Sequence, residues 1–223
     1  MGTRRSLPAS LIPTKLIIGA TGVLLFLYLV LHIIGNLMVF LGPGIFNSYA
    51  HMLISNPLVV PIEIGLAAVI VIHLYKAIAM TMKNQSARPV KYAKKAWAGG
   101  ASQKSIGSST MILTGLALLI FIPIHVLTFK YGTHYDFGDG VRDLYRLELE
   151  NFRSPLTVGF YLITMVLVGL HLWHGVASSF QSLGLEGPRF TPFVRILGKV
   201  SAVAIAGGFI AITLWVFLAA GRS

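Results

Sequence analysis

Five long apolar runs restrict this chain to very few folds. Each run holds about 20 residues or more, which is the length of α-helix that crosses a hydrocarbon core about 30 Å thick. Since lipid cannot satisfy backbone polar groups, runs of this kind form α-helices. The predicted membrane-spanning helices are residues 15–41, 58–82, 110–129, 156–180 and 196–219. The connections are too short for a separate soluble domain, so we expect an all-α membrane protein in which residues 1–223 form a single domain.

The composition agrees with a membrane protein and removes several kinds of site. Hydrophobic residues make up 55% of the 223 residues and charged residues only 11%, far from the usage of soluble domains. Cysteine is absent. This excludes disulfides, cysteine-ligated iron–sulfur clusters and covalently attached c-type haem, so any haem must be held by coordination and packing alone.

The net charge is +11, and the distribution of the basic residues indicates a membrane topology and not a nucleic-acid-binding surface. Basic residues gather ahead of the first helix and in alternate connections; they are Arg4, Arg5, Lys15, Lys83, Arg88, Lys91, Lys94, Lys95, Lys104, Arg189, Arg195 and Lys199. Cytoplasmic connections of membrane proteins are rich in Lys and Arg. We therefore expect a bacterial-type cytoplasmic membrane, with the N-terminus in the cytoplasm, the C-terminus outside, membrane lipid as a partner and no nucleic acid.

Each of the first four runs carries a histidine well inside the span, at His32, His73, His125 and His171. An ionisable side chain is costly in lipid, so each is a functional-site hypothesis. From the helical rise, His32 and His125 fall roughly 6 to 8 Å to the outer side of their helix centres. His73 and His171 fall roughly 5 to 6 Å to the inner side. These are the outer pair and the inner pair.

Two imidazoles at one depth can be the axial ligands of a b-type haem, and a four-helix bundle is a common way to hold one. One buried histidine is more often a packing residue, but four matched in depth by pairs favour two haems b. A zinc site is disfavoured because the spans contain no cysteine and only Glu63 as an acidic partner. A histidine-lined channel does not explain one histidine per helix. The glycines expected to make room for the porphyrins are Gly22, Gly35, Gly65, Gly115 and Gly169.

The first four helices read as one helical hairpin used twice. Thr21-Gly22 and Thr114-Gly115 stand at the same spacing before the two outer histidines, with ten residues from glycine to histidine. The second and fourth helices both open with a proline-containing turn. Duplicated halves are common among membrane folds. The fifth helix has no histidine and is predicted to be a packing helix.

Residues 14–40, 46–88, 110–132 and 169–184 closely resemble the single-chain, five-helix cytochrome b anchor of succinate dehydrogenases and fumarate reductases. The resemblance implies that His32 and His125 bind the outer haem and that His73 and His171 bind the inner one. It implies flavoprotein and iron–sulfur partner subunits on the cytoplasmic face, which carry the FAD, the clusters and the dicarboxylate chemistry. This chain would be the quinone-reactive subunit, passing electrons between the iron–sulfur subunit and menaquinone or another quinone through both haems. A higher oligomer is left open.

The quinone site is less defined than the haem ligands. The candidates are His51 and Glu63 on the outer side and Ser105, Ser108, His174 and Gln181 on the inner side. The resemblance and the depth of His73 both favour His171 over His174 as the ligand. A glutamate that a fumarate-reductase branch carries in the fourth helix, implicated in proton return, is Gly169 here, which puts such a proton path in doubt.

Two other functions stay open at this point. The chain could be the cytochrome b subunit of another respiratory enzyme, such as a hydrogenase. It could instead be a haem-free membrane transporter or scaffold.

Overall fold

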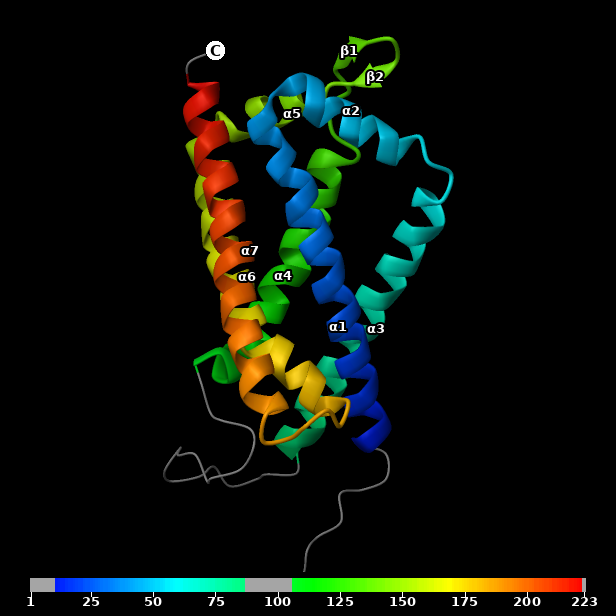
Figure 1. Ribbon diagram of the computed structural model, residues 1–223, viewed down its shortest axis with the longest axis vertical. Coiled ribbons are helices and arrows are strands. Elements are labelled where there is room, and N and C mark those ends of the chain that lie inside the picture. The colour runs from blue at the N-terminus through cyan, green and yellow to red at the C-terminus, as the bar shows by residue number, and fades with distance from the viewer. Residues whose placement is uncertain (1–10, 87–105, 222–223) are drawn as a thin grey trace, which may run out of the picture.

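The computed structural model describes residues 11–86 and 106–221, and within them it contains five helices long and apolar enough to cross a membrane (Figure 1). They are α1 (Leu11–Asn36), which a 3-10 helix η1 (Leu37–Leu41) continues, α3 (Val59–Ser86), α4 (Ile106–Phe129), α6 (Pro155–Ser182) and α7 (Phe190–Ala220). The prediction of an all-α membrane protein with five spanning helices is confirmed. The chain is a multi-pass membrane protein.

Helix ends follow local signals in the sequence. Ser154 caps α6 by accepting a hydrogen bond from the backbone N–H of Thr157, and Pro155 occupies the first helical position, where its missing N–H costs nothing. Past the other end of α6, Gly184 has φ 79°. Gly42, with φ 91°, separates η1 from the next helix. Glycine tolerates this left-handed region without strain, which allows the chain to turn sharply at both places.

One end of the bundle is closed by short elements that the sequence did not predict. These are α2 (Pro43–Ile54), α5 (Leu144–Phe152) and a hairpin of β1 (Asp136–Gly138) with β2 (Val141–Arg142), in which Asp136 pairs antiparallel with Arg142. We call α2, α5 and this hairpin the cap. The end of α7 lies at the cap end, and the start of α1 lies at the opposite end (Figure 1). The cap end is the one predicted to face outside.

The core of the bundle lies along α6. Its buried residues recur every three or four positions, from Val158 to Ala177, as expected for a helix with one packed face. It packs most extensively on α7, where small residues allow close approach. A Cβ on Gly198 would lie 3.4 Å from Cβ of Val176, and a Cβ on Gly169 would lie 3.1 Å from Cβ of Ala206.

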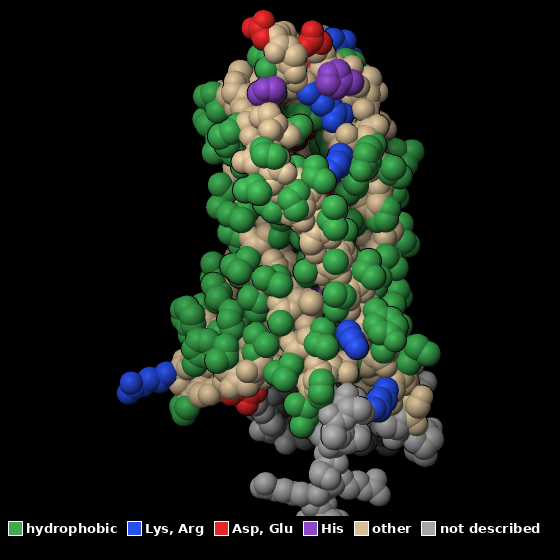
Figure 2. All heavy atoms as spheres, turned by 90° about the vertical axis from the view of Figure 1, so that its right-hand side faces the viewer, with side chains coloured by type: hydrophobic (Ala, Val, Ile, Leu, Met, Phe, Trp, Pro, Cys, Tyr) green, Lys and Arg blue, Asp and Glu red, His purple; other side chains and the backbone are tan. Residues whose placement is uncertain are grey.

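The outer surface of the bundle is suited to lipid. Hydrophobic side chains cover its shaft, while charged and histidine side chains gather towards the two ends (Figure 2). Helix α3 has no buried residue. It packs mainly along α1, so most of its apolar side chains face outward.

Candidate cofactor site

The outer pair lies between α1 and α4. The rings of His32 and His125 have centroids 5.8 Å apart and planes at 88°. Aromatic rings surround them: Phe121 stacks on His125 at 5.4 Å, Phe129 lies 5.1 Å from it, and Phe209 of α7 lies 5.6 Å from His32. The two histidines expected to act together therefore meet in an apolar setting near the cap.

Both outer rings are oriented through Nδ1. The Nδ1 atom of His125 is hydrogen-bonded to the hydroxyl of Tyr161 at 3.2 Å. The Nδ1 atom of His32 lies 3.4 Å from Nδ2 of Asn36, whose amide also donates to the His32 carbonyl at 2.7 Å. The other ring nitrogen, Nε2, has no hydrogen bond within the described part of the chain for either residue.

The inner pair consists of His73 on α3 and His171 on α6, and each is an electrostatic neighbour of the other. Each Nδ1 atom is bound by a threonine of the preceding spanning helix. The Thr21 hydroxyl lies 2.9 Å from His73 Nδ1, and the Thr114 hydroxyl lies 3.0 Å from His171 Nδ1. The two halves of the chain therefore use the same contact.

The threonines select the tautomer of the inner histidines. A hydroxyl has one proton, and Thr21 can donate it to the carbonyl of Ile17 at 2.7 Å, while Thr114 can donate it to the carbonyl of Thr110 at 3.0 Å. Each threonine oxygen then accepts from the Nδ1–H of its histidine. This leaves the Nε2 lone pair available for a metal, and second-sphere hydrogen bonds of this kind orient metal-binding imidazoles.

The glycine after each threonine lies beside an inner histidine. A Cβ on Gly22 would lie 3.5 Å from Cε1 of His73, and a Cβ on Gly115 would lie 3.6 Å from Cε1 of His171, both ordinary contacts. The atom that a Cβ on Gly22 would clash with is Oγ of Ser179. The other glycines expected to make room for a porphyrin have other neighbours. A Cβ on Gly35 would meet the Tyr49 ring at 2.9 Å, Gly169 faces α7, and nothing lies within 4 Å of a Cβ on Gly65.

Two imidazoles per site fit haem better than a naked metal ion. No group of three or more His, Cys, Asp or Glu side chains suited to a metal occurs in residues 11–86 and 106–221. Haem supplies four nitrogens from its ring and needs only axial ligands. His32 and His125, whose ring centroids lie 5.8 Å apart, would supply such a pair of imidazoles.

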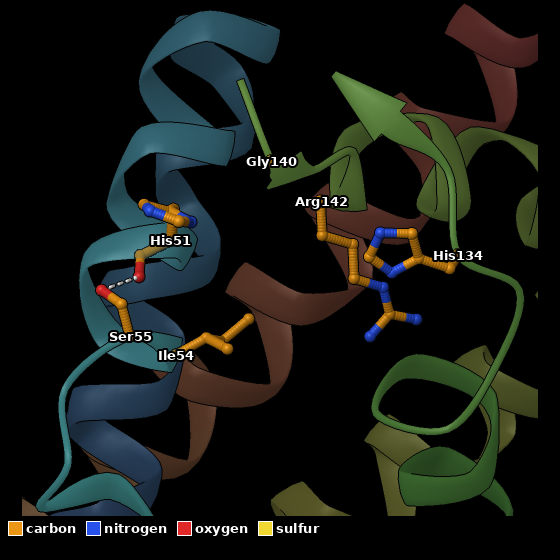
Figure 3. Close-up of a pocket in the computed structure, with 6 residues that line it drawn as sticks. All are labelled: His51, Ile54, Ser55, His134, Gly140 and Arg142. Atoms are coloured by element: carbon orange, nitrogen blue, oxygen red, sulfur yellow. Dashed lines mark hydrogen bonds between the residues drawn. The ribbon is translucent and has the colours of Figure 1, made fainter. Parts of the chain in front are cut away.

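His51 lies in a cavity of about 370 Å³ in the cap (Figure 3). His51, Ile54 and Ser55 of α2 face His134 and Arg142 across it, with Gly140 completing the lining. Arg142 donates to the carbonyls of Lys130, Gly132 and Thr133. Its Nε atom is buried without a partner in the described chain, and burial lowers the pKa of Arg142.

Glu63, the other outer candidate, does not line the cavity at His51. Its carboxylate is ion-paired with Lys130 at the end of α4, and the two side chains are 41% and 42% exposed. The pair joins the start of α3 to the end of α4. The geometry therefore supports a structural role for Glu63, as the partner of Lys130.

The inner quinone candidates are only partly described. Ser105 lies outside the described residues, and so does the side chain of Ser108. His174 and Gln181 are half-buried on α6, two turns apart and so separated by roughly 10 Å along the helix. His171, and not His174, lies opposite Thr114.

Sequence reasoning missed the partners of the histidines. Thr21 and Thr114 stand out in the sequence only as part of the repeat, although a hydroxyl beside a glycine in a span is a signal for a polar contact. Tyr161 is a polar aromatic residue within a predicted span, which is the one signal the sequence offers for its contact with His125.

A comparison of the chain with protein-family models, with curated proteins and with solved structures finds no match. The functional argument therefore depends on the site itself.

Proposed function

We propose that the chain is the membrane anchor and two-haem cytochrome b subunit of a succinate:quinone oxidoreductase, working between a partner iron–sulfur subunit and menaquinone or another quinone. The observation that supports it most is the pairing of the four span histidines at two depths. In the inner pair, both histidines are held through Nδ1 by a threonine of the opposite helix in the hairpin. A repeated arrangement that leaves Nε2 available on each ring suits axial ligation.

The residues of this chain would hold and orient the two groups. His32 and His125 would bind the outer haem through Nε2, and His73 and His171 would bind the inner one. Bound haem iron would supply one-electron transfer across the membrane. Thr21, Thr114 and Tyr161 fix the ring orientations, and the apolar shaft keeps water from both sites.

The partners are proposed from the charge distribution. In this proposal the end opposite the cap faces the cytoplasm and docks the flavoprotein and iron–sulfur subunits, which carry FAD and the clusters. The basic residues of the connection 87–105 lie outside the described part of the chain. Among the described residues at the end opposite the cap, Lys83, Arg189 and Arg195 are also basic.

Haem content tests the proposal directly. The purified chain, or its complex, should give two b-type haems per chain by pyridine haemochrome analysis, and replacing any one of the four histidines by alanine should halve that number. His134→Ala is the matched control, because His134 lies outside the spanning helices, on the cavity at His51, and should not change the count. A chain without visible haem absorption would support a transporter or scaffold instead.

A cytochrome b subunit of another respiratory enzyme would pass the haem test equally well. Co-purification separates the two functions. A flavoprotein with succinate-dependent quinone reduction supports the proposed function, and a hydrogenase subunit in its place overturns it.

A further inference from the structure

Glu148 is a buried carboxyl group of the cap without a cation beside it. The residue is 6% exposed, and its Oε2 atom is buried without a hydrogen-bond partner in the part of the chain described. The charged residues near it on α5 are engaged elsewhere. Glu150 pairs with Arg153 at 3.3 Å, and the Arg146 guanidinium lies 4.4 Å from the centroid of the Tyr135 ring. An unpaired buried carboxylate is costly, so this group favours the neutral acid.

Burial moves the titration of this group into the neutral range. It raises the pKa of Glu148 from 4.5 to about 8. A surface carboxyl is ionised throughout that range. Glu148 can therefore gain or lose a proton in response to a modest change in nearby charge.

The face of α5 that carries Glu148 packs against Tyr161. Phe152 stands one turn after Glu148 on the same face of α5, and its ring packs edge-on against Tyr161 with centroids 4.9 Å apart. The charge of Glu148 also acts on the Tyr161 hydroxyl. That hydroxyl is 3.2 Å from Nδ1 of His125, so Tyr161 connects the surroundings of Glu148 to the outer pair.

The other elements packed against α5 bring no cation towards Glu148 within the described residues. The buried residues of α7 at this end are apolar or threonine, and its charged residues, Arg195 and Lys199, lie at the opposite end. Several titratable side chains lie near the cap. Asp143 precedes α5 and Tyr145 lies on it. The neighbouring elements contribute Tyr161 on α6, His125 on α4, Lys130 just after α4, and Tyr49 and His51 on α2. Of these, Asp143 accepts from Asn47, and Lys130 pairs with Glu63.

We propose that Glu148 is a redox-linked proton-binding residue of the outer histidine site. The step starts from ionised Glu148. When the site between His32 and His125 accepts one electron from a hydroquinone donor, the hydroquinone becomes a semiquinone and releases one proton to water, and the Glu148 carboxylate accepts one proton from the aqueous phase on the cap side. An O–H bond forms on Glu148, and it breaks again when the electron leaves. The inference rests on the proposed function, because it needs an electron-accepting group at the outer pair.

Electrostatics links the two events. An added electron makes the apolar site more negative, which favours the neutral form of a nearby acid. By reciprocity, protonating the acid makes the electron easier to add. The midpoint potential of the outer site must then fall as the pH rises through the pKa of Glu148, and the inner site, further from the cap, should respond less.

The test is a spectroelectrochemical titration of the full chain in its complex from about pH 6 to about pH 10, a window that spans the pKa of Glu148. In wild type the outer midpoint potential should fall with pH around 8. Glu148→Gln should lose that dependence. Glu150→Gln, on the same helix but ion-paired at the surface, should keep it. Equal pH dependence in wild type and Glu148→Gln would overturn the inference.

Infrared spectroscopy provides a second measurement of the proton uptake, which can be made on wild type even if Glu148→Gln fails to assemble. The reduced-minus-oxidised spectrum of wild type should contain the carbonyl band of a newly protonated carboxylic acid, and the band should shift in Glu148→Asp. Haem is counted in every sample. Two haems without such a band overturn this inference alone, whereas a chain without haem overturns the proposed function and this inference together.

Discussion

The hydroxyl of Thr114 on α4 lies 3.0 Å from Nδ1 of His171 on α6. The same contact joins Thr21 on α1 to His73 on α3 at 2.9 Å. Each threonine is followed by a glycine that lies beside the imidazole of the same histidine. Two hairpins of one chain therefore present their histidines in the same way, which makes the threonines the natural place to perturb the inner pair.

Replacing Thr114 by valine should weaken haem binding at the inner site by about 10- to 100-fold, the usual effect of removing a second-sphere partner of a metal-bound histidine. Valine keeps the shape of threonine and removes only the hydroxyl. Haem retention by the purified variant during dilution, measured spectroscopically, checks this. Thr114→Ser should retain the inner haem.

Thr164→Val is the matched control for that change. Thr164 is as buried as Thr114, but its hydroxyl donates to the carbonyl of Phe160. Equal haem loss in Thr114→Val and Thr164→Val would show that the hydroxyl acts on helix packing and not on His171.

The two neighbouring histidines of α6 should behave differently. His171→Ala is expected to lose the inner haem, because His171 is the ring held by Thr114. His174→Ala should keep both haems and at most change quinone kinetics or the inner potential. Pyridine haemochrome analysis of the two variants decides the matter: half the haem in His174→Ala with full haem in His171→Ala would move the ligand to His174.

The carboxyl of Glu148 should make the stability of the fold depend on pH. Burial raises the pKa of Glu148 to about 8, above its value in the unfolded chain, so its contribution is fully present below about pH 4.5 and is lost as the pH rises through 8. At about 1.4 kcal/mol per pKa unit the full effect is on the order of 5 kcal/mol. Glu148→Gln should therefore melt at a higher temperature than wild type at about pH 9, where the wild-type carboxyl is ionised.

Thermal unfolding of the haem-loaded chain in detergent, followed by tryptophan fluorescence, measures this pH dependence. Glu150→Gln removes a surface carboxylate that pairs with Arg153 and should follow the wild-type profile. A Glu148→Gln profile that coincides with wild type across the same pH range would mean that Glu148 stays in contact with water.

The predicted orientation of the chain in the membrane can be tested by labelling single introduced cysteines, since the sequence contains no cysteine. Asp139→Cys in the cap hairpin and Glu186→Cys between α6 and α7 are both exposed and lie at opposite ends of the bundle. In sealed right-side-out vesicles an impermeant maleimide should label the first and not the second. The reverse pattern would place the cap in the cytoplasm.

The membrane spans could be predicted from the sequence because their length is set by the bilayer. The predicted span 156–180 corresponds to α6, which comprises Pro155–Ser182. Ser154 and Pro155 mark the start of this helix. The cap could not be predicted, since α2 and α5 are held by contacts between distant residues. Asn47 donates to Asp143, which is 96 residues away in the chain, at 2.8 Å. No local pattern encodes such a contact.

The candidate site also has a part that could be predicted from the sequence and a part that could not. Helical periodicity gave the depth of each histidine, but it could not say which residue would meet Nδ1, because Thr21 and His73 are 52 residues apart. Nothing in the sequence around Glu148 indicates that this carboxyl is buried. Its burial depends on how α5 packs against α7 and α6, which is a property of the assembled bundle.

Helix α3 has no buried residue, whereas α6 and α7 share a continuous packed seam. Helices that insert separately associate in order of the packing they gain, so α6 with α7 should pair early and α3 should join last. Polar contacts that attach it to the rest of the chain include those of Thr21 with His73 and of Glu63 with Lys130. Moving α3 aside would therefore leave the seam between α6 and α7 intact.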